Sequence, residues 1–215
     1  MVIKSKKEQT NKHTAANLDL LGGRLCLDFA NTADWHASPN PQEYLTSYAD
    51  LLAWGRHAKA LTTEQVESML CLAEHRPAEA ATILERAIAL REDIYRIFVA
   101  VTKGVPPPTD DLAALNAVLN EAIIHRRVVY TGSGFAWEWD NSDALDYILW
   151  PIACSAAELL TSPDLARVRQ CAGDPCGWLF LDESRNRSRR WCDMRSCGNR
   201  AKARRHYRRT VAAAP

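Results

Sequence analysis

The sequence lacks the long apolar run of a membrane-spanning helix, because no hydrophobic segment approaches the roughly 20 consecutive residues that cross a bilayer. The N-terminus, MVIKSKKEQTNKHTAANLD, is basic, but no apolar stretch follows its lysines, so it does not resemble a secretory signal. We therefore expect residues 1–17 to form a disordered polar lead. We also expect a cytoplasmic protein without a membrane partner.

The sequence also lacks the motifs of common enzymes. It contains no P-loop, no GxGxxG, no HExxH and no set of Ser, His and Asp that indicates a triad. No spacing typical of catalysis surrounds the histidines His36, His57, His75, His125 and His206. We expect that the protein is not an enzyme. A small-molecule enzyme centred on the part of the chain before residue 167 stays an alternative.

The chain has a net charge of only +1, but its charges are separated along the sequence. Residues 167–215 carry 13 Lys and Arg against 4 Asp and Glu, a balance of +9, whereas the other 166 residues carry 14 against 22, a balance of −8. A basic segment joined to an acidic body is typical of a protein that binds a polyanion. A basic tail that only keeps the protein soluble is the alternative.

The seven cysteines fall into two groups. Cys26, Cys71 and Cys154 lie among apolar neighbours and are expected to be buried small hydrophobes. The other four follow the pattern C-x4-C-x15-C-x4-C, in which two close pairs can each supply two thiolates to a tetrahedral zinc ion. In a reducing cytosol, such a cluster indicates a metal rather than disulfides. The spacing predicts one structural zinc held by Cys171, Cys176, Cys192 and Cys197.

Three other uses of these thiols are possible. Four thiolates leave no open coordination position, so a catalytic zinc is disfavoured. The spacing also differs from the usual ferredoxin runs, although an iron–sulfur or redox-switched site stays open. Four incidental thiols would not explain two matched pairs.

The segments between the cysteines predict a small treble-clef-like finger. Gly177 follows the first pair and suits a tight turn with positive φ. WLFLD (178–182) is expected to be a strand and ESRNRS (183–188) a polar turn, and the second cysteine pair opens the last helix. We expect a small core of Trp178, Leu179, Phe180 and Trp191. Because this core is too small to fold alone, metal binding would supply folding free energy.

Basic residues cluster in the polar turn and on the last helix. In that helix they cover an arc of roughly 200° at about 100° per residue. Arginine suits bidentate contacts to phosphate and to guanine. The predicted nucleic-acid contacts are Arg185, Arg187, Arg189, Arg190, Arg200, Lys202, Arg204, Arg205, Arg208 and Arg209.

The remaining helix positions are expected to pack on the finger. They are Asn199, Ala203, His206 and Tyr207. Tyr207 and Trp191 could instead stack on bases. A basic helix that grips the acidic body is the alternative. Charge alone does not distinguish DNA from RNA.

Residues 18–164 predict a helix-rich α+β body with a few antiparallel strands. GGRLCLDFANT (22–32) is expected to be a strand with Leu25, Leu27 and Phe29 on one face, and 36–42 a loop. Thr62 or Thr63, Pro77 and Thr109 mark helix starts. Helices are expected over 43–59, 63–75, 77–103 and 109–125, and then from Asn141 or Ser142 to Thr161 with a kink at Pro151. A hairpin is expected over 126–140, and TSPD (161–164) ends the body.

Polar residues near the first segment could line a pocket. Asp28 and Asn31 lie where the expected strand leaves the core, and Arg24 and Trp150 could join them in binding a small ligand. The alternative is that Asp28 and Asn31 bond to the backbone and fix a turn.

CAGDPCGWLFLDESRNRSRRWCDMRSCGNRAKARRHYRR (171–209) closely resembles the CGNR zinc-finger family of bacterial proteins, whose tetrapeptide is Cys197 to Arg200. Residues 18–164 resemble the ABATE domain through GGRLCLDFANT and LDYILWPIACSAAELLTSPDLARVRQC (145–171). The resemblance implies a stress-induced transcription regulator in which residues 165–215 bind zinc and DNA. The ABATE-like body would sense a small effector or form a homodimer. A protein-interaction module and an RNA binder are the alternatives.

Overall fold

The computed structural model describes residues 13–140 and 144–212, and side chains through residue 210. Its described part combines helices with two-stranded antiparallel sheets, which confirms the predicted α+β class. No described helix is both long enough and apolar enough to cross a membrane. The main helices of the body are α1 (Leu25–Ala30), α2 (Tyr48–His57), α3 (Thr63–His75), α4 (Pro77–Lys103), α5 (Thr109–Ile124) and α6 (Leu149–Leu160).

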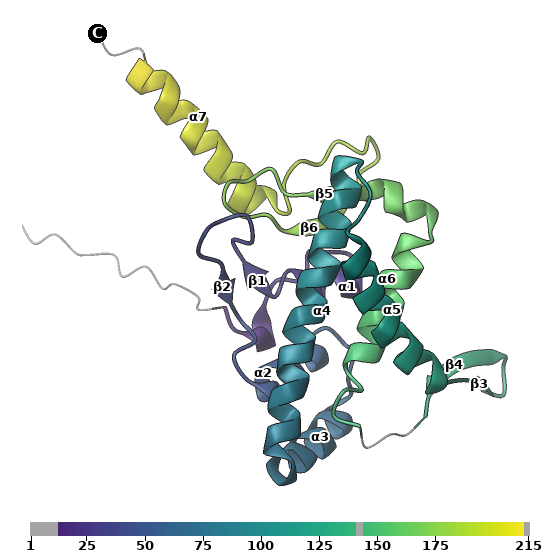
Figure 1. The fold of residues 1–215 in the computed structure, drawn as a ribbon. Coiled ribbons are helices and arrows are strands. Elements are labelled where there is room, and N and C mark those ends of the chain that lie inside the picture. The colour runs from purple at the N-terminus through teal and green to yellow at the C-terminus, as the bar shows by residue number, and fades with distance from the viewer. Residues whose placement is uncertain (1–12, 141–143, 213–215) are drawn as a thin grey trace, which may run out of the picture.

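The long helix α4 runs along the body, with α5 and α6 beside it and α2 and α3 at one end (Figure 1). Its predicted bounds are confirmed, with Pro77 as the first residue and Gly104 in the left-handed region after the last. The start of α3 is confirmed too, because Thr62 and Gln65 form a capping box. The helices of the body enclose one apolar core, in which side chains such as Trp54 and Phe98 are fully buried.

The prediction of a strand over 22–32 is wrong, because this segment forms the short helix α1. Its buried side chains are Cys26, Leu27, Phe29 and Ala30, which is helical rather than alternating spacing. Short apolar runs carry too few residues to separate these two periods. The helix lies between α4, α6 and the C-terminal strand pair, so all of its sides except that of Asp28 and Leu25 face protein.

Two other helix boundaries differ from prediction. Helix α2 begins only after Ser47, whose side chain accepts a hydrogen bond from the Asp50 amide, because β1 (Ala33–Asp34) and β2 (Gln42–Glu43) pair before it. Helix α6 begins at Leu149, and the expected starts at 141 and 142 lie outside the described residues. Pro151 therefore sits in the first turn, where no amide partner is lost, and the expected kink is wrong. The predicted start of α5 at Thr109 is confirmed, although Pro108 rather than Thr109 is its N-cap.

The predicted hairpin is confirmed as β3 (Arg126–Tyr130) and β4 (Phe135–Trp139), which extends from one end of the body (Figure 1). The C-terminal part starts with a short helix, η2 (Pro163–Arg167), and then β5 (Val168–Gln170) pairs with β6 (Leu179–Leu181). A π-helical turn, η3 (Met194–Gly198), leads into α7 (Asn199–Ala212). Helix α7 points away from the rest of the molecule at the end opposite the hairpin (Figure 1).

Strand β6 belongs to two cores at once. Leu179 and Leu181 face the body core, whereas Trp178 and Phe180 face a second cluster with the four cysteines. Side chains alternate between the two faces of a strand, so a single three-residue strand serves both. The prediction that Leu179 belongs to the finger core is therefore wrong. The cores of the body and of the finger therefore pack against opposite faces of β6.

Candidate metal centre and basic surface

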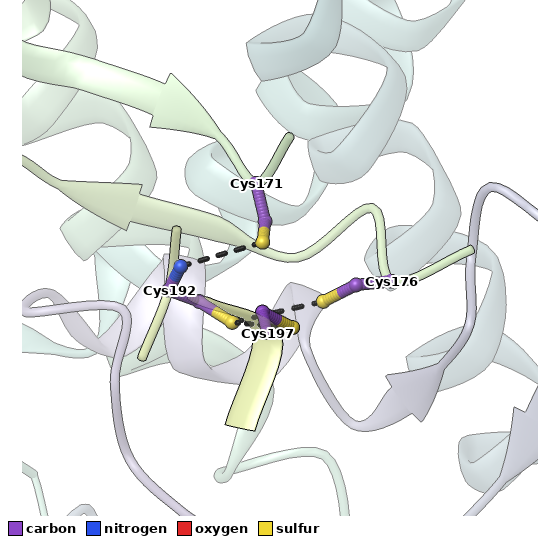
Figure 2. Close-up of side chains that lie close together, drawn as sticks. All are labelled: Cys171, Cys176, Cys192 and Cys197. Atoms are coloured by element: carbon purple, nitrogen blue, oxygen red, sulfur yellow. Dashed lines mark hydrogen bonds between the residues drawn. The ribbon is translucent and has the colours of Figure 1, made fainter. Parts of the chain in front are cut away.

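Four cysteine thiols converge at the start of the C-terminal part. Cys171 follows β5, Cys176 ends the loop after it, and Cys192 and Cys197 come from the segment before α7. Their Sγ atoms all lie within 4.8 Å of one another, and all four residues are at least nine-tenths buried. Figure 2 shows the four side chains pointing toward a common centre. The predicted metal ligands are brought together.

The geometry fits one zinc ion. Sγ of Cys192 lies 3.7 Å from Sγ of Cys176 and 3.7 Å from Sγ of Cys197. A tetrahedral ion with Zn–S bonds of about 2.3 Å separates its sulfurs by about 3.8 Å. A disulfide would hold two sulfurs only about 2.0 Å apart. The distances match a metal centre and exclude a disulfide, so the chain carries a four-cysteine zinc site.

The charge of the cluster points the same way. Hydrogen bonds with neighbouring thiols, together with burial, raise the pKa of Cys176 and Cys192 above the usual range of a thiol. Four thiolates held this close would repel one another, and a cation between them would offset that repulsion. A bound zinc ion supplies that positive charge and cross-links the two halves of the finger.

Donors outside the four thiols stabilise the thiolates. The amides of Gly173 and Cys192 each donate to Sγ of Cys171 at 3.4 Å. The guanidinium of Arg200 donates to Sγ of Cys197 at 3.0 Å. The arginine in the CGNR tetrapeptide thus belongs to the metal centre as well as to the basic helix. Sequence reasoning assigned Arg200 only to nucleic acid.

Two glycines make the centre compact. A Cβ on Gly173 would lie 3.0 Å from Cβ and 3.1 Å from Sγ of Cys197, closer than ordinary contact. Gly177 has φ of +74°, as predicted, and a Cβ there would lie 2.7 Å from the amide nitrogen of Ala37. The second contact joins the finger to the loop between β1 and β2.

Tyr95 of α4 continues this junction. Its hydroxyl donates to the carbonyl of Gly177 at 3.2 Å and accepts from Nε2 of Gln170 at 2.9 Å. Its ring stacks on His36 with centroids 3.8 Å apart. Nε2 of His36 lies 3.1 Å from both carboxylate oxygens of Glu92. A connected set of polar groups therefore runs from the long body helix to the turn beside Cys176.

Arg91 holds the same region together from inside the body. It is only 2% exposed, and its guanidinium makes two 2.7 Å hydrogen bonds with the Glu43 carboxylate of β2. It also donates to Glu92 at 3.0 Å. Burial raises the pKa of Glu92, but the hydrogen bond from His36 and the charge of Arg91 outweigh burial and lower it to about 2. Sequence reasoning missed this network, whose one signal is an arginine in the apolar stripe of α4.

A buried carboxylate organises the arginine-rich loop after β6. Asp182 is fully buried and accepts hydrogen bonds from the amides of Ser184 at 2.9 Å and Arg189 at 3.0 Å. Burial raises its pKa, but these hydrogen bonds and that of the Ser184 hydroxyl outweigh it and lower the pKa below the usual value. Asp182 therefore fixes both ends of the loop as an anion. Sequence reasoning had counted it only as part of the WLFLD strand.

The arginines of this loop differ in role. The Arg189 guanidinium donates to the carbonyls of Trp191 and Cys192 and lies over the ring of Phe180, 4.4 Å from its centroid. It therefore supports the metal centre from inside. Arg185 and Arg187 are exposed, and Arg190 stacks beside Trp191 at 5.4 Å.

Helix α7 carries the other basic residues into solvent. Residues 202–210 are all exposed, and Tyr207 is 70% exposed. The prediction that one stripe of α7 packs on the finger is therefore wrong. That stripe comprises Asn199, Ala203, His206 and Tyr207. Only the first turns touch the finger, because the helix axis leads away from it (Figure 1).

A basic groove lies where α7 leaves the finger. Its volume is about 460 Å³, and one wall is the loop of Ala172, Gly173 and Asp174. The other wall is made by Arg200, Ala201, Arg204, Arg205, Arg208 and Arg209. Arg204 donates to the Asp174 carbonyl at 2.7 Å and lies 3.2 Å from its carboxylate. Lys202 lies outside this groove and is exposed.

The structure does not bring the four suggested ligand-binding residues to a common cavity. Arg24 forms an ion pair with Asp164, and the carboxylate of Asp28 accepts a 2.7 Å hydrogen bond from the Gly22 amide. Asn31 bonds to the backbone of β6. Trp150 is buried and stacks on His125 with centroids 4.1 Å apart. These four side chains therefore contact other groups of the protein rather than a shared pocket. Asp28 and Asn31 bond to the backbone, as the alternative interpretation of the sequence predicts.

A different cavity lies between the body and the finger. It measures about 360 Å³ and is walled by the rings of Tyr44 and Trp178 and by Leu18 and Leu21. Its polar groups include Asp19, Asp34, Arg195 and Arg200, and Cys176, Cys192 and Cys197 also border it. Burial raises the pKa of Asp34, although the charges of Arg200 and His13 act in the opposite direction. No residue of this cavity had been proposed as ligand-binding from the sequence.

Comparison with protein families gives two adjoining matches. The ABATE family model, described as "Putative stress-induced transcription regulator", matches residues 23–163, which is more than half of the chain. The CGNR zinc finger model matches residues 167–210, the segment that contains the four cysteines and α7. Both matches are of the kinds expected from the sequence, and neither describes an enzyme. A search of curated proteins found no similar sequence.

Proposed function

The chain belongs to the ABATE family and ends in a CGNR zinc finger, and from this premise we propose that it is a transcription regulator that binds duplex DNA through α7. The observation that carries the proposal is the solvent-exposed basic helix on a metal-stabilised base. We further propose that residues 18–164 and residues 165–215 are two domains with separate roles. The two family matches, which meet between 163 and 167, support it.

Helix α7 has the size and chemistry of an element that enters the major groove. Its 14 residues span about 21 Å at about 1.5 Å per residue. Exposed cations with no ion pair among the described residues are Lys202, Arg205, Arg208 and Arg209. The guanidinium group of arginine matches guanine edges and phosphate oxygens. Because the helix has few apolar residues, it is expected to contact water or a polyanion rather than an apolar surface.

The metal centre gives the helix a fixed direction. Cys197 lies in the turn just before α7, and Arg200 in its first turn donates to the Cys197 sulfur. The exposed loop arginines Arg185, Arg187 and Arg190 add positive charge that can contact phosphates beside the groove. Arg189 is left out of the proposed contacts because its guanidinium is bonded to the finger backbone.

The test is binding of zinc-loaded protein to random duplex DNA, followed by sequencing of the selected pool and a salt titration. We expect log K to fall linearly with log salt by about 0.9 per phosphate contact. Changing Arg205, Arg208 and Arg209 together to Ala should weaken binding more than about 100-fold and lower the slope by about 3. Arg56→Ala, which removes an exposed arginine of α2, is the matched control and should leave both unchanged. Unmeasurable binding at low salt would end the proposal.

The alternatives differ in measurable ways. An RNA binder would favour RNA over duplex DNA of the same sequence at equal salt. A protein-interaction module would bind an acidic protein and show no selected DNA sequence. An exposed basic helix suits each of these polyanions, so the competition experiment decides between them.

The cavity between body and finger supports a second element of the proposal, a small effector. Its volume and mixed apolar and polar lining match those of small-molecule sites. An occupant would touch Tyr44 of the body and Arg200 of the finger together, so it could change how α7 is held. A thermal-shift screen of metabolites tests this. A true effector should raise the melting temperature of the wild type and of the exposed control Asp110→Asn, but not that of Asp34→Asn. It should also change the affinity of the protein for DNA.

A further inference from the structure

The β3–β4 hairpin presents an apolar face to solvent. Six of the twelve large apolar side chains that are exposed in the described part lie between residues 123 and 137. Four of them alternate along the hairpin, where Val128 faces Trp137 and Tyr130 faces Phe135 across the strands. They are 56%, 62%, 68% and 79% exposed in the order Val128, Trp137, Tyr130 and Phe135. Alternation puts all four on the same face of the sheet.

The base of this hairpin contacts the body. Arg126 lies over the rings of Trp137 and Trp139, 4.7 and 5.5 Å from their centroids. Trp139 in turn packs against Trp150 of the core, with centroids 6.0 Å apart. The apolar row therefore continues from the buried core to the tip of the hairpin. A two-stranded hairpin is marginally stable alone, so four exposed large side chains on it indicate a missing partner.

The exposed area is near what a stable pair of proteins needs. At roughly 200 Å² for each aromatic side chain, the three rings together expose about 400 Å². Val128 raises this to roughly 500 Å². Two such faces would bury about 1,000 Å², the area that a specific interface is expected to reach.

We propose that a second copy of this chain covers the face, so that the protein is a homodimer joined through its β3–β4 hairpins. A two-fold interface requires one patch that matches itself, and a predominantly apolar face meets that condition. Arg126 lies on this face, at the end nearest the body, and pairs with Glu158 at 3.4 Å. Arg127 and Glu138 are on the other face of the hairpin and pair with each other at 3.2 Å. The one charge named on this face is therefore at its edge and is offset by a carboxylate of the same chain.

The position of the hairpin agrees with this arrangement. It lies at the end of the molecule opposite α7 (Figure 1). Pairing through the hairpins would therefore leave both basic helices exposed. The dimer deepens the proposed function, because two helices could read two half-sites, but the inference itself depends only on the apolar face.

Sedimentation of the full zinc-loaded chain tests the inference. We expect a mass of twice 24.1 kDa at micromolar concentration. The double variant Phe135→Glu with Trp137→Glu should raise the dissociation constant more than about 100-fold and give monomers, with unchanged zinc content and far-ultraviolet circular dichroism. Val105→Glu, in the loop after α4, alters a residue that is 51% exposed outside the face and should remain dimeric.

A second measurement does not depend on the folding of the double variant. With Cys71 changed to Ser, Tyr130→Cys should form an intermolecular disulfide under mild oxidation, whereas Val105→Cys should not. A monomeric wild type at 100 μM, or a dimer in which Tyr130→Cys does not cross-link, would overturn the inference. DNA binding is measured separately. A monomer that still binds one half-site would contradict the dimer inference without contradicting the proposed function.

Discussion

Asn31, at the end of α1, forms two 2.8 Å hydrogen bonds with one residue of β6: its Nδ2 donates to the Leu179 carbonyl and its Oδ1 accepts from the Leu179 amide. Both residues are fully buried. The side chain thus replaces a neighbouring strand for β6, whose Leu179 side chain lies in the body core. One amide joins the ABATE domain to the strand that supports the metal centre.

Asn31→Ala should destabilise the protein strongly. It leaves a buried amide and a buried carbonyl of Leu179 without partners, at a cost of about 3 kcal/mol. For a chain of this size, that should lower the melting temperature by roughly 6–12 °C. The exposed asparagine of α5 gives the control, Asn116→Ala, which should change it little. Equal melting temperatures for the two variants would show that the bond pair is not a structural tie.

Zinc removal should loosen the finger and leave the body folded. We expect one zinc per chain by mass spectrometry of the metal. After chelation, amide exchange should rise over residues 171–200 while α4 stays protected, because α4 belongs to a separate core. Cys192→Ser should lower zinc affinity more than about 100-fold, whereas Cys71→Ser, an exposed thiol on α3, should keep full metal content. Zinc-free protein with a protected finger would contradict the metal assignment.

Asp28 gives a pH dependence with a definite sign. Burial raises its pKa to about 6, despite the hydrogen bond from the Gly22 amide, whereas the unfolded value is about 3.9. The folded state therefore binds the proton more tightly, so Asp28 favours folding below about pH 4 and this contribution is lost as the pH rises through 6.

The variant Asp28→Asn should remove that dependence. Its amide oxygen can still accept the Gly22 hydrogen bond without carrying a buried charge. We expect the free energy of unfolding of Asp28→Asn to exceed that of the wild type by about 3 kcal/mol at pH 7.5 and by less at pH 5.5. Denaturant unfolding at the two pH values measures the difference, with Asp110→Asn as the exposed control. A constant difference between the two pH values would refute the assignment.

The sequence predicted the parts of this structure that depend on local chemistry. Cysteine spacing identified the zinc ligands because short loops can supply pairs of thiolates without help from distant residues. Capping residues such as Thr62 and Pro77 marked helix starts for the same reason. The fold class followed from periodicity over the long helices.

The errors lie where distant contacts decide. The segment around Leu27 is helical because it is surrounded by protein, which a short apolar run does not reveal. Leu179 belongs to the body core because β6 is shared, and Asn31 serves that strand rather than a pocket. Tyr207 was expected to pack because amphipathic helices usually do, but α7 leaves the finger after its first turns.

Asp174 offers a test of how α7 is used. Its exposed carboxylate lies 3.2 Å from the Arg204 guanidinium in the basic groove, so it competes with a phosphate for that side chain. A surface pair contributes at most about 1 kcal/mol, so Asp174→Asn should leave the melting temperature nearly unchanged. The loss of a negative charge beside the groove should instead tighten DNA binding, by roughly 2- to 10-fold at low salt, with a smaller gain at high salt because ions screen the repulsion. Glu183→Gln, which removes an exposed acid at the start of the arginine loop, is the matched control for net charge. If both variants tighten binding equally, the effect is one of total charge, and if Asp174→Asn weakens binding, the DNA does not pass through this groove.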